Sequence, residues 1–151
     1  MRSMSRLVVA FGVLMTEAGL LASDDATRKE LARLEGTWRI AASEKDGQGS
    51  PPGDVESTTY SVAGEKYTVR RQGEVVEEGT FRIDPTRKPR SIDVFPSKPE
   101  GKIQRGIYEW AEDGAIRICF THPGEDDRPA RLSTTEGTGH TLTTARRIGP
   151  K

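Results

Sequence analysis

One cysteine and two histidines are the side chains in this sequence best suited to metal binding or nucleophilic chemistry. Cys119 and His122 are three positions apart, and His140 lies further along the chain. In an extended strand, side chains three positions apart point to opposite faces, so Cys119 and His122 converge only if the strand ends between them. A zinc site needs three or four converging ligands. We therefore predict no metal site and no cofactor, with Cys119 facing away from the core.

Acidic pairs and a glycine-containing run are the remaining candidates for catalysis or phosphate binding. Adjacent carboxylates occur at Glu77-Glu78 and Asp126-Asp127, and neighbours of this kind are typical of solvated edges and loops. The run from Glu136 to His140 lacks the strand-loop-helix context of a phosphate cradle. No Gly-x-Ser-x-Gly elbow is present. The sequence therefore nominates no catalytic residue, and an enzyme is the third hypothesis, behind two kinds of binding module.

Four aromatic side chains suggest a different chemistry, the binding of a small ligand. Tyr60, Tyr67, Tyr108 and Trp110 each combine an apolar ring with a polar tip. Such residues suit the mouth of a ligand pocket. They also suit a plain core, which is the commoner role of inward aromatic residues in small barrels. The sequence leaves both roles open.

Short runs of alternating apolar and polar residues predict the strands that would carry these rings. They lie near residues 37–42, 60–62, 66–70, 80–83, 92–94, 107–110, 116–120 and 140–147, with a weak strand near Leu132. Asp113-Gly114 is a strong hairpin turn. A short helix is predicted over residues 26–34. Eight or nine short strands without long helices between them predict an all-β sandwich or barrel and exclude a parallel α/β sheet.

Length and charge limit the classes of partner. The chain has 151 residues with 23 basic and 23 acidic side chains, so its formal charge is zero. That length suits one domain. A neutral balance provides no basic surface for nucleic acid. The single cysteine excludes an intrachain disulfide.

The N-terminus has the order of a secretory signal. Arg2 and Arg6 precede an apolar run over residues 7–15, and small residues follow up to Ala22. The run is too short to span a membrane, for which about twenty apolar residues are needed. We predict a signal peptide at residues 1–22 and one exported domain at 23–151. The product would be periplasmic or extracellular, with no membrane span in the mature chain.

Several motifs in fixed order point to a known family. They lie at 34–38 (Leu-Glu-Gly-Thr-Trp), 79–86, 106–109, 116–120 and 137–142. Together they resemble an uncharacterised lipocalin-like domain family common in planctomycete bacteria, over about residues 24–147. The resemblance implies an antiparallel, calycin-type barrel of about eight strands. It implies no activity, because none is established for that family.

The wider lipocalin-like comparison implies a structural closure of one barrel end. In such barrels a Gly-x-Trp on the first strand closes the end, and an arginine near the end of the last strand lies over the tryptophan ring. Gly36 and Trp38 match the first part. Arg146 or Arg147 would supply the second, and counting by twos from Leu142, taken as inward, selects Arg146.

Two functional hypotheses follow. Seven aromatic rings on the predicted inward faces favour a mostly filled barrel with space near one mouth. The first hypothesis is a non-enzymatic, exported barrel that binds a small apolar or amphipathic ligand there. The alternative is a protein-interaction or inhibitor module that uses the loops 46–57 and 121–128 on a filled barrel.

Overall fold

A computed structural model describes residues 17–97 and 101–149 of the chain. The helices in these ranges are α1 (Glu17–Leu34) and α2 (Pro52–Glu56). The strands are β1 (Gly36–Lys45), β2 (Gln48–Gly49), β3 (Thr58–Ala63), β4 (Lys66–Arg71), β5 (Glu74–Asp84), β6 (Arg90–Pro96), β7 (Gln104–Trp110), β8 (Ile116–Phe120) and β9 (Thr141–Arg147).

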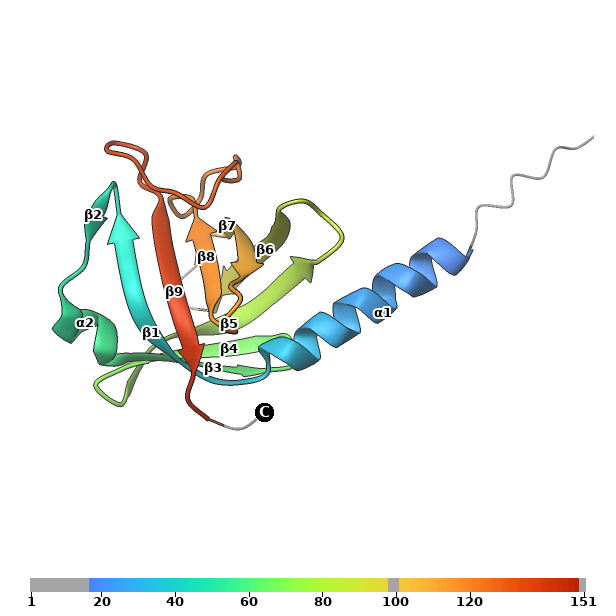
Figure 1. Cartoon of the computed structure of the whole chain (residues 1–151), viewed down its shortest axis with the longest axis horizontal. Coiled ribbons are helices and arrows are strands. Elements are labelled where there is room, and N and C mark those ends of the chain that lie inside the picture. Colours follow the sequence, from blue (N-terminus) through green and yellow to red (C-terminus); the bar gives the residue numbers. More distant parts are fainter. Residues whose placement is uncertain (1–16, 98–100, 150–151) are drawn as a thin grey trace, which may run out of the picture.

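The strands form an antiparallel barrel (Figure 1). From β3 to β9 each strand pairs with the next one along the chain, and β1 pairs with both β3 and β9. This pairing closes an eight-stranded barrel, while the two-residue β2 lies outside it against the end of β1. The predicted all-β, lipocalin-like barrel with an N-terminal helix is therefore confirmed.

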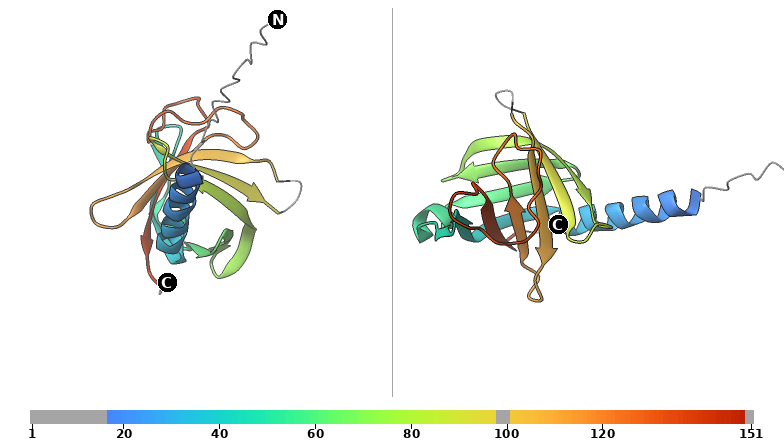
Figure 2. Two further views of the ribbon diagram at one scale, coloured as in Figure 1. Left: turned by 90° about the vertical axis from the view of Figure 1, so that its right-hand side faces the viewer. Right: turned by 90° about the horizontal axis from the view of Figure 1, so that it is seen from above.

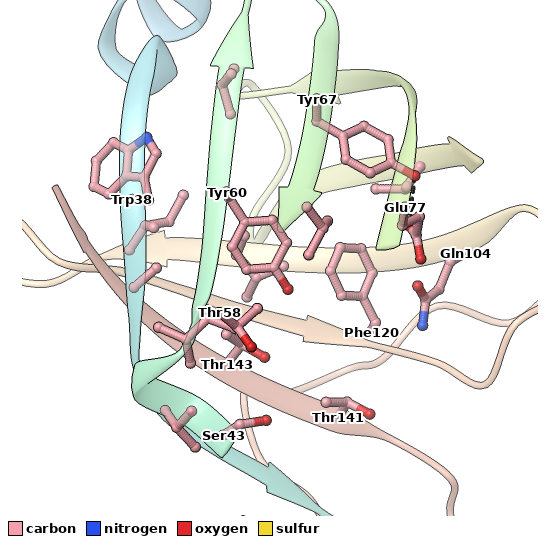
Figure 3. A pocket seen from close by; sticks show the side chains of 18 of the residues that line it. Trp38, Ser43, Thr58, Tyr60, Tyr67, Glu77, Gln104, Phe120, Thr141 and Thr143 are labelled. Atoms are coloured by element: carbon pink, nitrogen blue, oxygen red, sulfur yellow. Dashed lines mark hydrogen bonds between the residues drawn. The ribbon is translucent and has the colours of Figure 1, made fainter. Parts of the chain in front are cut away.

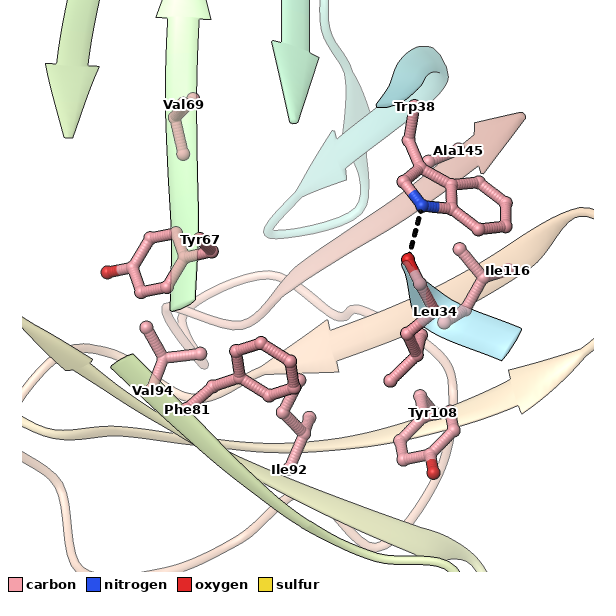
Figure 4. Packing of buried hydrophobic residues seen from close by; sticks show 10 residues of the cluster. All are labelled: Leu34, Trp38, Tyr67, Val69, Phe81, Ile92, Val94, Tyr108, Ile116 and Ala145. Carbon is pink, nitrogen blue, oxygen red and sulfur yellow. Dashed lines mark hydrogen bonds between the residues drawn. The ribbon is translucent and has the colours of Figure 1, made fainter. Parts of the chain in front are cut away.

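Alternation along the strands places the apolar side chains in the barrel interior. Trp38, Tyr67, Phe81 and Ile92 belong to one buried cluster that draws on β1, β4, β5 and β6 (Figure 4). A β-bulge near Ile40 shifts the pairing of β1 with β9. Bulges of this kind increase the local twist and bend of a strand, which helps a small sheet to close.

Helix α1 projects from one end of the barrel, and α2 lies at the opposite end (Figures 1 and 2). The apolar residues that α1 packs against the buried cluster are Leu31 and Leu34 in its last turns. The Trp38 ring nitrogen donates a hydrogen bond of 2.8 Å to the carbonyl of Leu34. We call this closed part of the barrel the helix end. The helix begins at Glu17, nine residues before the predicted start.

The connection from β8 to β9 packs on the outside of the barrel. Arg128 in this segment donates hydrogen bonds to the carbonyls of Ile92 and Gly106. Cys119 faces outward and is 0% exposed, and its thiol lies 3.6 Å from the carbonyl of Ser133. The strand predicted near Leu132 is wrong, because the polar groups of this segment bond to the outer face and neighbouring loops instead of a ladder.

Candidate functional site

The barrel contains a cavity of about 530 Å³. It runs from the helix end, where Leu34 and Trp38 are buried, to the other end of the barrel, where its lining residues Asp54, Arg71 and Glu77 are exposed. The volume falls within the range of small-molecule sites, about 300 to 1,000 Å³. The cavity is therefore closed at one end and open to solvent at the other.

The walls of the cavity are mainly apolar. Seven of the eight barrel strands contribute apolar side chains to the walls, and β7 contributes only the polar Gln104. The apolar lining residues are Leu34, Trp38, Ile40, Val55, Tyr60, Val62, Tyr67, Val69, Val76, Phe81, Ile92, Val94, Ile116, Ile118, Phe120 and Ala145. Such walls favour the hydrocarbon or aromatic part of a ligand.

One glycine helps to keep the cavity open. Gly106 lies on β7 opposite Phe120 of β8, and a Cβ at this position would come within 2.6 Å of the Phe120 ring. Without a side chain at 106, the ring lies close against the β7 backbone. Any larger residue would push this ring away from the wall, toward the space that the cavity occupies.

Polar side chains gather where the cavity opens. We call this end the mouth and define it by Ser43, Thr58, Glu77, Gln104 and Thr141, which all line the cavity (Figure 3). They come from β1, β3, β5, β7 and β9. The gradient from apolar walls to a polar mouth suits a ligand with one apolar and one polar end.

Two tyrosines lie between the apolar walls and the mouth. The hydroxyl of Tyr67 donates a hydrogen bond of 2.7 Å to Oε1 of Glu77 (Figure 3). Burial, this hydrogen bond and the Glu77 charge all raise the pKa of Tyr67. Burial and then the Glu77 charge raise the pKa of Tyr60 to about 12, although Arg71 acts in the opposite direction. Both hydroxyls are therefore neutral near pH 7, and Glu77 is held as an acceptor.

The other two aromatic residues predicted to line the mouth lie elsewhere. Tyr108 is 1% exposed and Trp110 is half-buried, and neither lines the cavity. The Tyr108 hydroxyl and the Trp110 ring nitrogen both donate hydrogen bonds to Oε1 of Glu30 on α1, at 3.0 and 2.7 Å. Their polar tips are thus used to hold α1 at the helix end. The structure brings Tyr60 and Tyr67 to the cavity and separates Tyr108 and Trp110 from it.

The predicted closure of the helix end forms with one correction. Gly36 begins β1 at a φ of 127°, which favours glycine, and Trp38 packs beneath α1. Arg147, not Arg146, lies over the Trp38 ring, at 4.3 Å from its centroid, and donates to the carbonyl of Glu35. Arg146 instead forms an ion pair with Asp113.

The phase of β9 explains why Arg147, and not Arg146, lies over Trp38. Thr143 and Ala145 are the residues of β9 that face the cavity, so Arg147 continues the inward set. Leu142 faces outward and lines a second groove beside α2. The sequence pattern alone does not distinguish an apolar residue in this outer groove from one in the core.

The cavity is also larger than the predicted space near one mouth. Two of the seven rings assigned to the interior, Tyr108 and Trp110, pack at the helix end. Near the mouth, inward positions carry small side chains such as Ser43, Thr58 and Thr141. The alternative hypothesis assumed a filled barrel as scaffold, and the barrel is hollow. The use of the loops 46–57 and 121–128 by a protein partner stays a prediction.

Some residues of the site were missed from the sequence. Glu77 was interpreted as part of a solvated acidic pair, and Gln104, Thr58 and Thr141 were not singled out. The one usable signal is the hairpin turn at Gln72-Gly73, which by itself would set Val76 opposite Val69, an inward residue of β4. A register shift next to Val69 sets Glu77 there instead. The polar residues of the mouth have no such signal, since they alternate in the same way as solvent-facing positions.

No metal centre forms in the part of the chain that the structure describes. Within residues 17–97 and 101–149, no three His, Cys, Asp or Glu side chains come together. His122 is exposed, and burial raises the pKa of the Cys119 thiol, which disfavours the thiolate that binds metals.

Among the described helices, none is long and apolar enough to cross a membrane.

The fold and the cavity define a hollow antiparallel barrel with one open end. Comparison of the chain with known protein families, curated proteins and solved structures found no match. The resemblance to the planctomycete lipocalin-like family therefore stays a prediction.

Proposed function

We propose that this protein binds a small amphipathic molecule in its barrel, with the apolar part inside and the polar part at the mouth. The observation that carries this proposal is the cavity of about 530 Å³, which is closed by Leu34 and Trp38 and bordered by polar side chains at its open end. Burial of apolar ligand surface against such walls contributes about 25 cal/mol per Å² before the costs of association.

The polar groups of the mouth support an amphipathic ligand over a purely apolar one. The Tyr60 hydroxyl lines the cavity, and no hydrogen bond to it from another described residue is present. A hydroxyl that faces a pocket without such a partner is available to a ligand or to water. A hydrocarbon that reached Tyr60 and the mouth would displace water without replacing its hydrogen bonds, which costs affinity.

The proposal is tested by titrating the purified protein with decanol in a calorimeter, below the concentration at which decanol separates from water. We expect saturable binding with one site per chain and a negative heat-capacity change, the robust marker of apolar burial. Absence of saturable heat would contradict the proposal.

A pair of neighbouring variants shows whether binding occurs inside the barrel. Val69 faces the cavity and Thr68 does not, although both lie on β4. Val69→Trp would place a large ring in the cavity and is expected to weaken decanol binding by about tenfold or more. Thr68→Trp adds the same ring outside and should leave the affinity unchanged. Equal affinities in both variants would place the ligand elsewhere on the protein.

Export and family membership form a separate part of the proposal. The order of charged, apolar and small residues over 1–22 supports a signal peptide. Residues 1–16 lie outside the described part of the chain, and the proposed cleavage point after Ala22 falls within α1. N-terminal sequencing of the protein recovered from a bacterial extracytoplasmic fraction should begin at Ser23. Recovery only from the cytoplasm, with Met1 retained, would contradict export.

A further inference from the structure

At the inner side of the mouth, a carboxylate that is held by a hydrogen bond lies near three aromatic rings. Glu77 lines the cavity and accepts the hydrogen bond from Tyr67. The rings of Tyr60, Tyr67 and Phe120 lie in the same part of the cavity (Figure 3). Aromatic faces carry negative partial charge and attract cations, most strongly when water is excluded. Rings and carboxylate therefore favour the same kind of ligand group, a cation.

The other charged residues that line the cavity do not reverse this preference. They are Asp54 on α2 and Arg71 at the end of β4, so the lining has two acidic side chains and one basic side chain. At the Tyr60 hydroxyl, the raising effect of the Glu77 charge on the pKa exceeds the lowering effect of Arg71. At this hydroxyl, the Glu77 charge therefore outweighs the Arg71 charge.

Arg71 is the one group that favours an anionic ligand, and it is less well organised than Glu77. Both side chains are exposed, but no hydrogen bond or ion pair within the described residues holds the Arg71 side chain. Glu77 is held by Tyr67 before any ligand arrives. A group that is already held in place loses less conformational freedom on binding than a free one.

We infer that the ligand carries a cationic ammonium head, which binds against Glu77 between the rings of Tyr60, Tyr67 and Phe120 while its apolar part fills the barrel. This inference rests on the proposed binding function and names the chemical class of the ligand. Glu77 acts as the residue that determines specificity. Tyr67 is a positioning residue, because it holds the carboxylate.

The inference is tested with three probes that share one alkyl chain and differ in the head: decylammonium, decanol and decanoate. Each is titrated by calorimetry at pH 7, below the concentration at which decylammonium or decanoate forms micelles and decanol separates from water. We expect decylammonium to bind about fivefold or more tighter than decanol, and decanoate to bind most weakly. The size of the preference reflects a carboxylate that is partly open to solvent together with cation and ring attraction.

Two matched variants distinguish the effect of the Glu77 charge on binding from that of general surface charge. Glu77→Gln keeps an oxygen that accepts the Tyr67 hydrogen bond but removes the charge. Glu78→Gln removes one charge at the next position of β5, where the side chain is exposed and does not line the cavity. The preference for decylammonium over decanol should disappear in Glu77→Gln and persist in Glu78→Gln.

The possible results are distinguishable. If decanol binds but decylammonium binds no tighter, or if its preference survives in Glu77→Gln, the inference is overturned and the proposed function stands. Tightest binding of decanoate, lost in Arg71→Gln, overturns the inference in favour of an anionic ligand. If none of the three probes binds, the proposed function fails as well.

Discussion

The two ends of the barrel use the same residue types for opposite purposes. At the helix end, Tyr108 and Trp110 donate hydrogen bonds to Glu30, and the ring nitrogen of Trp38 donates one to the carbonyl of Leu34. At the mouth, Tyr67 holds Glu77, while Tyr60 has no hydrogen-bond partner among the described residues. The difference teaches that an inward tyrosine is a candidate binding residue when it lines the cavity, as Tyr60 and Tyr67 do, and not when its hydroxyl fastens a helix to the barrel, as that of Tyr108 does.

Trp38 should show the largest effect on the helix end. It is 3% exposed and contacts both α1 and the cavity. Trp38→Ala removes a buried aromatic side chain and its hydrogen bond, and we expect the free energy of unfolding to fall by about 3 to 5 kcal/mol. Denaturation by urea measures this loss. An unchanged midpoint would show that the helix end is not a packed closure.

Glu30 is expected to come next, because two donors depend on it. Glu30→Ala leaves the Tyr108 hydroxyl and the Trp110 ring nitrogen without their acceptor and should cost about 2 kcal/mol. Glu30→Gln retains an oxygen and should cost less. Lys29→Ala on the exposed side of α1 is the control and should change the free energy of unfolding by under about 0.5 kcal/mol. Equal losses in all three variants would contradict the role given to Glu30.

Alkaline pH tests the burial of the tyrosines at both ends without mutation. The pKa of Tyr60 is raised from 10.0 to about 12, and those of Tyr67 and Tyr108 are raised too. A raised pKa means that the folded state holds the proton more tightly than the unfolded chain. The Tyr60 contribution, on the order of 2 kcal/mol, is therefore complete below pH 10 and lost between about pH 10 and 12.

The measurement for this prediction is tyrosinate absorbance followed together with circular dichroism during an alkaline titration. The chain has three tyrosines, and all three have raised pKa values, so tyrosinate should form late and together with unfolding. Full ionisation near pH 10 in a folded protein would contradict the burial of these rings.

Removing single tyrosine hydroxyls should affect the free energy of unfolding differently at the two ends. Tyr108→Phe deletes a buried hydrogen bond to Glu30 and should cost about 1 kcal/mol. Tyr60→Phe deletes a hydroxyl that faces the cavity and should leave the free energy of unfolding unchanged within about 0.5 kcal/mol. Urea denaturation of both variants checks the pair. A larger loss for Tyr60→Phe than for Tyr108→Phe would contradict the structural role given to Tyr108.

Two neighbouring arginines test which side chain closes the helix end. Arg147 lies over Trp38 and bonds to backbone carbonyls of α1 and its connection to β1, so Arg147→Ala should cost about 1 kcal/mol. Arg146 forms an exposed ion pair with Asp113, and Arg146→Ala should cost about half of that or less. Thermal unfolding of both variants tests the order, and the reverse order would restore Arg146 as the closing residue.

The barrel itself could be predicted from the sequence, because alternation reports which positions share a face. The cavity could not, since its size depends on where each ring lies along the barrel axis. Trp110 alternates like an inward residue, yet it belongs to the helix end, next to Arg33 on α1. Leu142 shows the second limit: an apolar residue that lines an outer groove has the same pattern as one in the core.

The site could be predicted only in part for a similar reason. Tyr60 and Tyr67 were found because aromatic residues on inward faces are conspicuous in a sequence. Glu77 was not, because an acidic pair has the same pattern on a solvated edge as beside a pocket. Its role depends on the Tyr67 hydroxyl, ten positions away in the chain, and this contact arises only from the β4–β5 register.

The location of a bound amphipath tests the hollow barrel most directly. With methyl-labelled protein and decanol, nuclear Overhauser effects should connect decanol protons to Val69 and Ile118, which line the cavity. Ile107 is equally apolar and 1% exposed but does not line the cavity, and it should show none. Contacts to Ile107 without contacts to Val69 and Ile118 would contradict a ligand site inside the barrel.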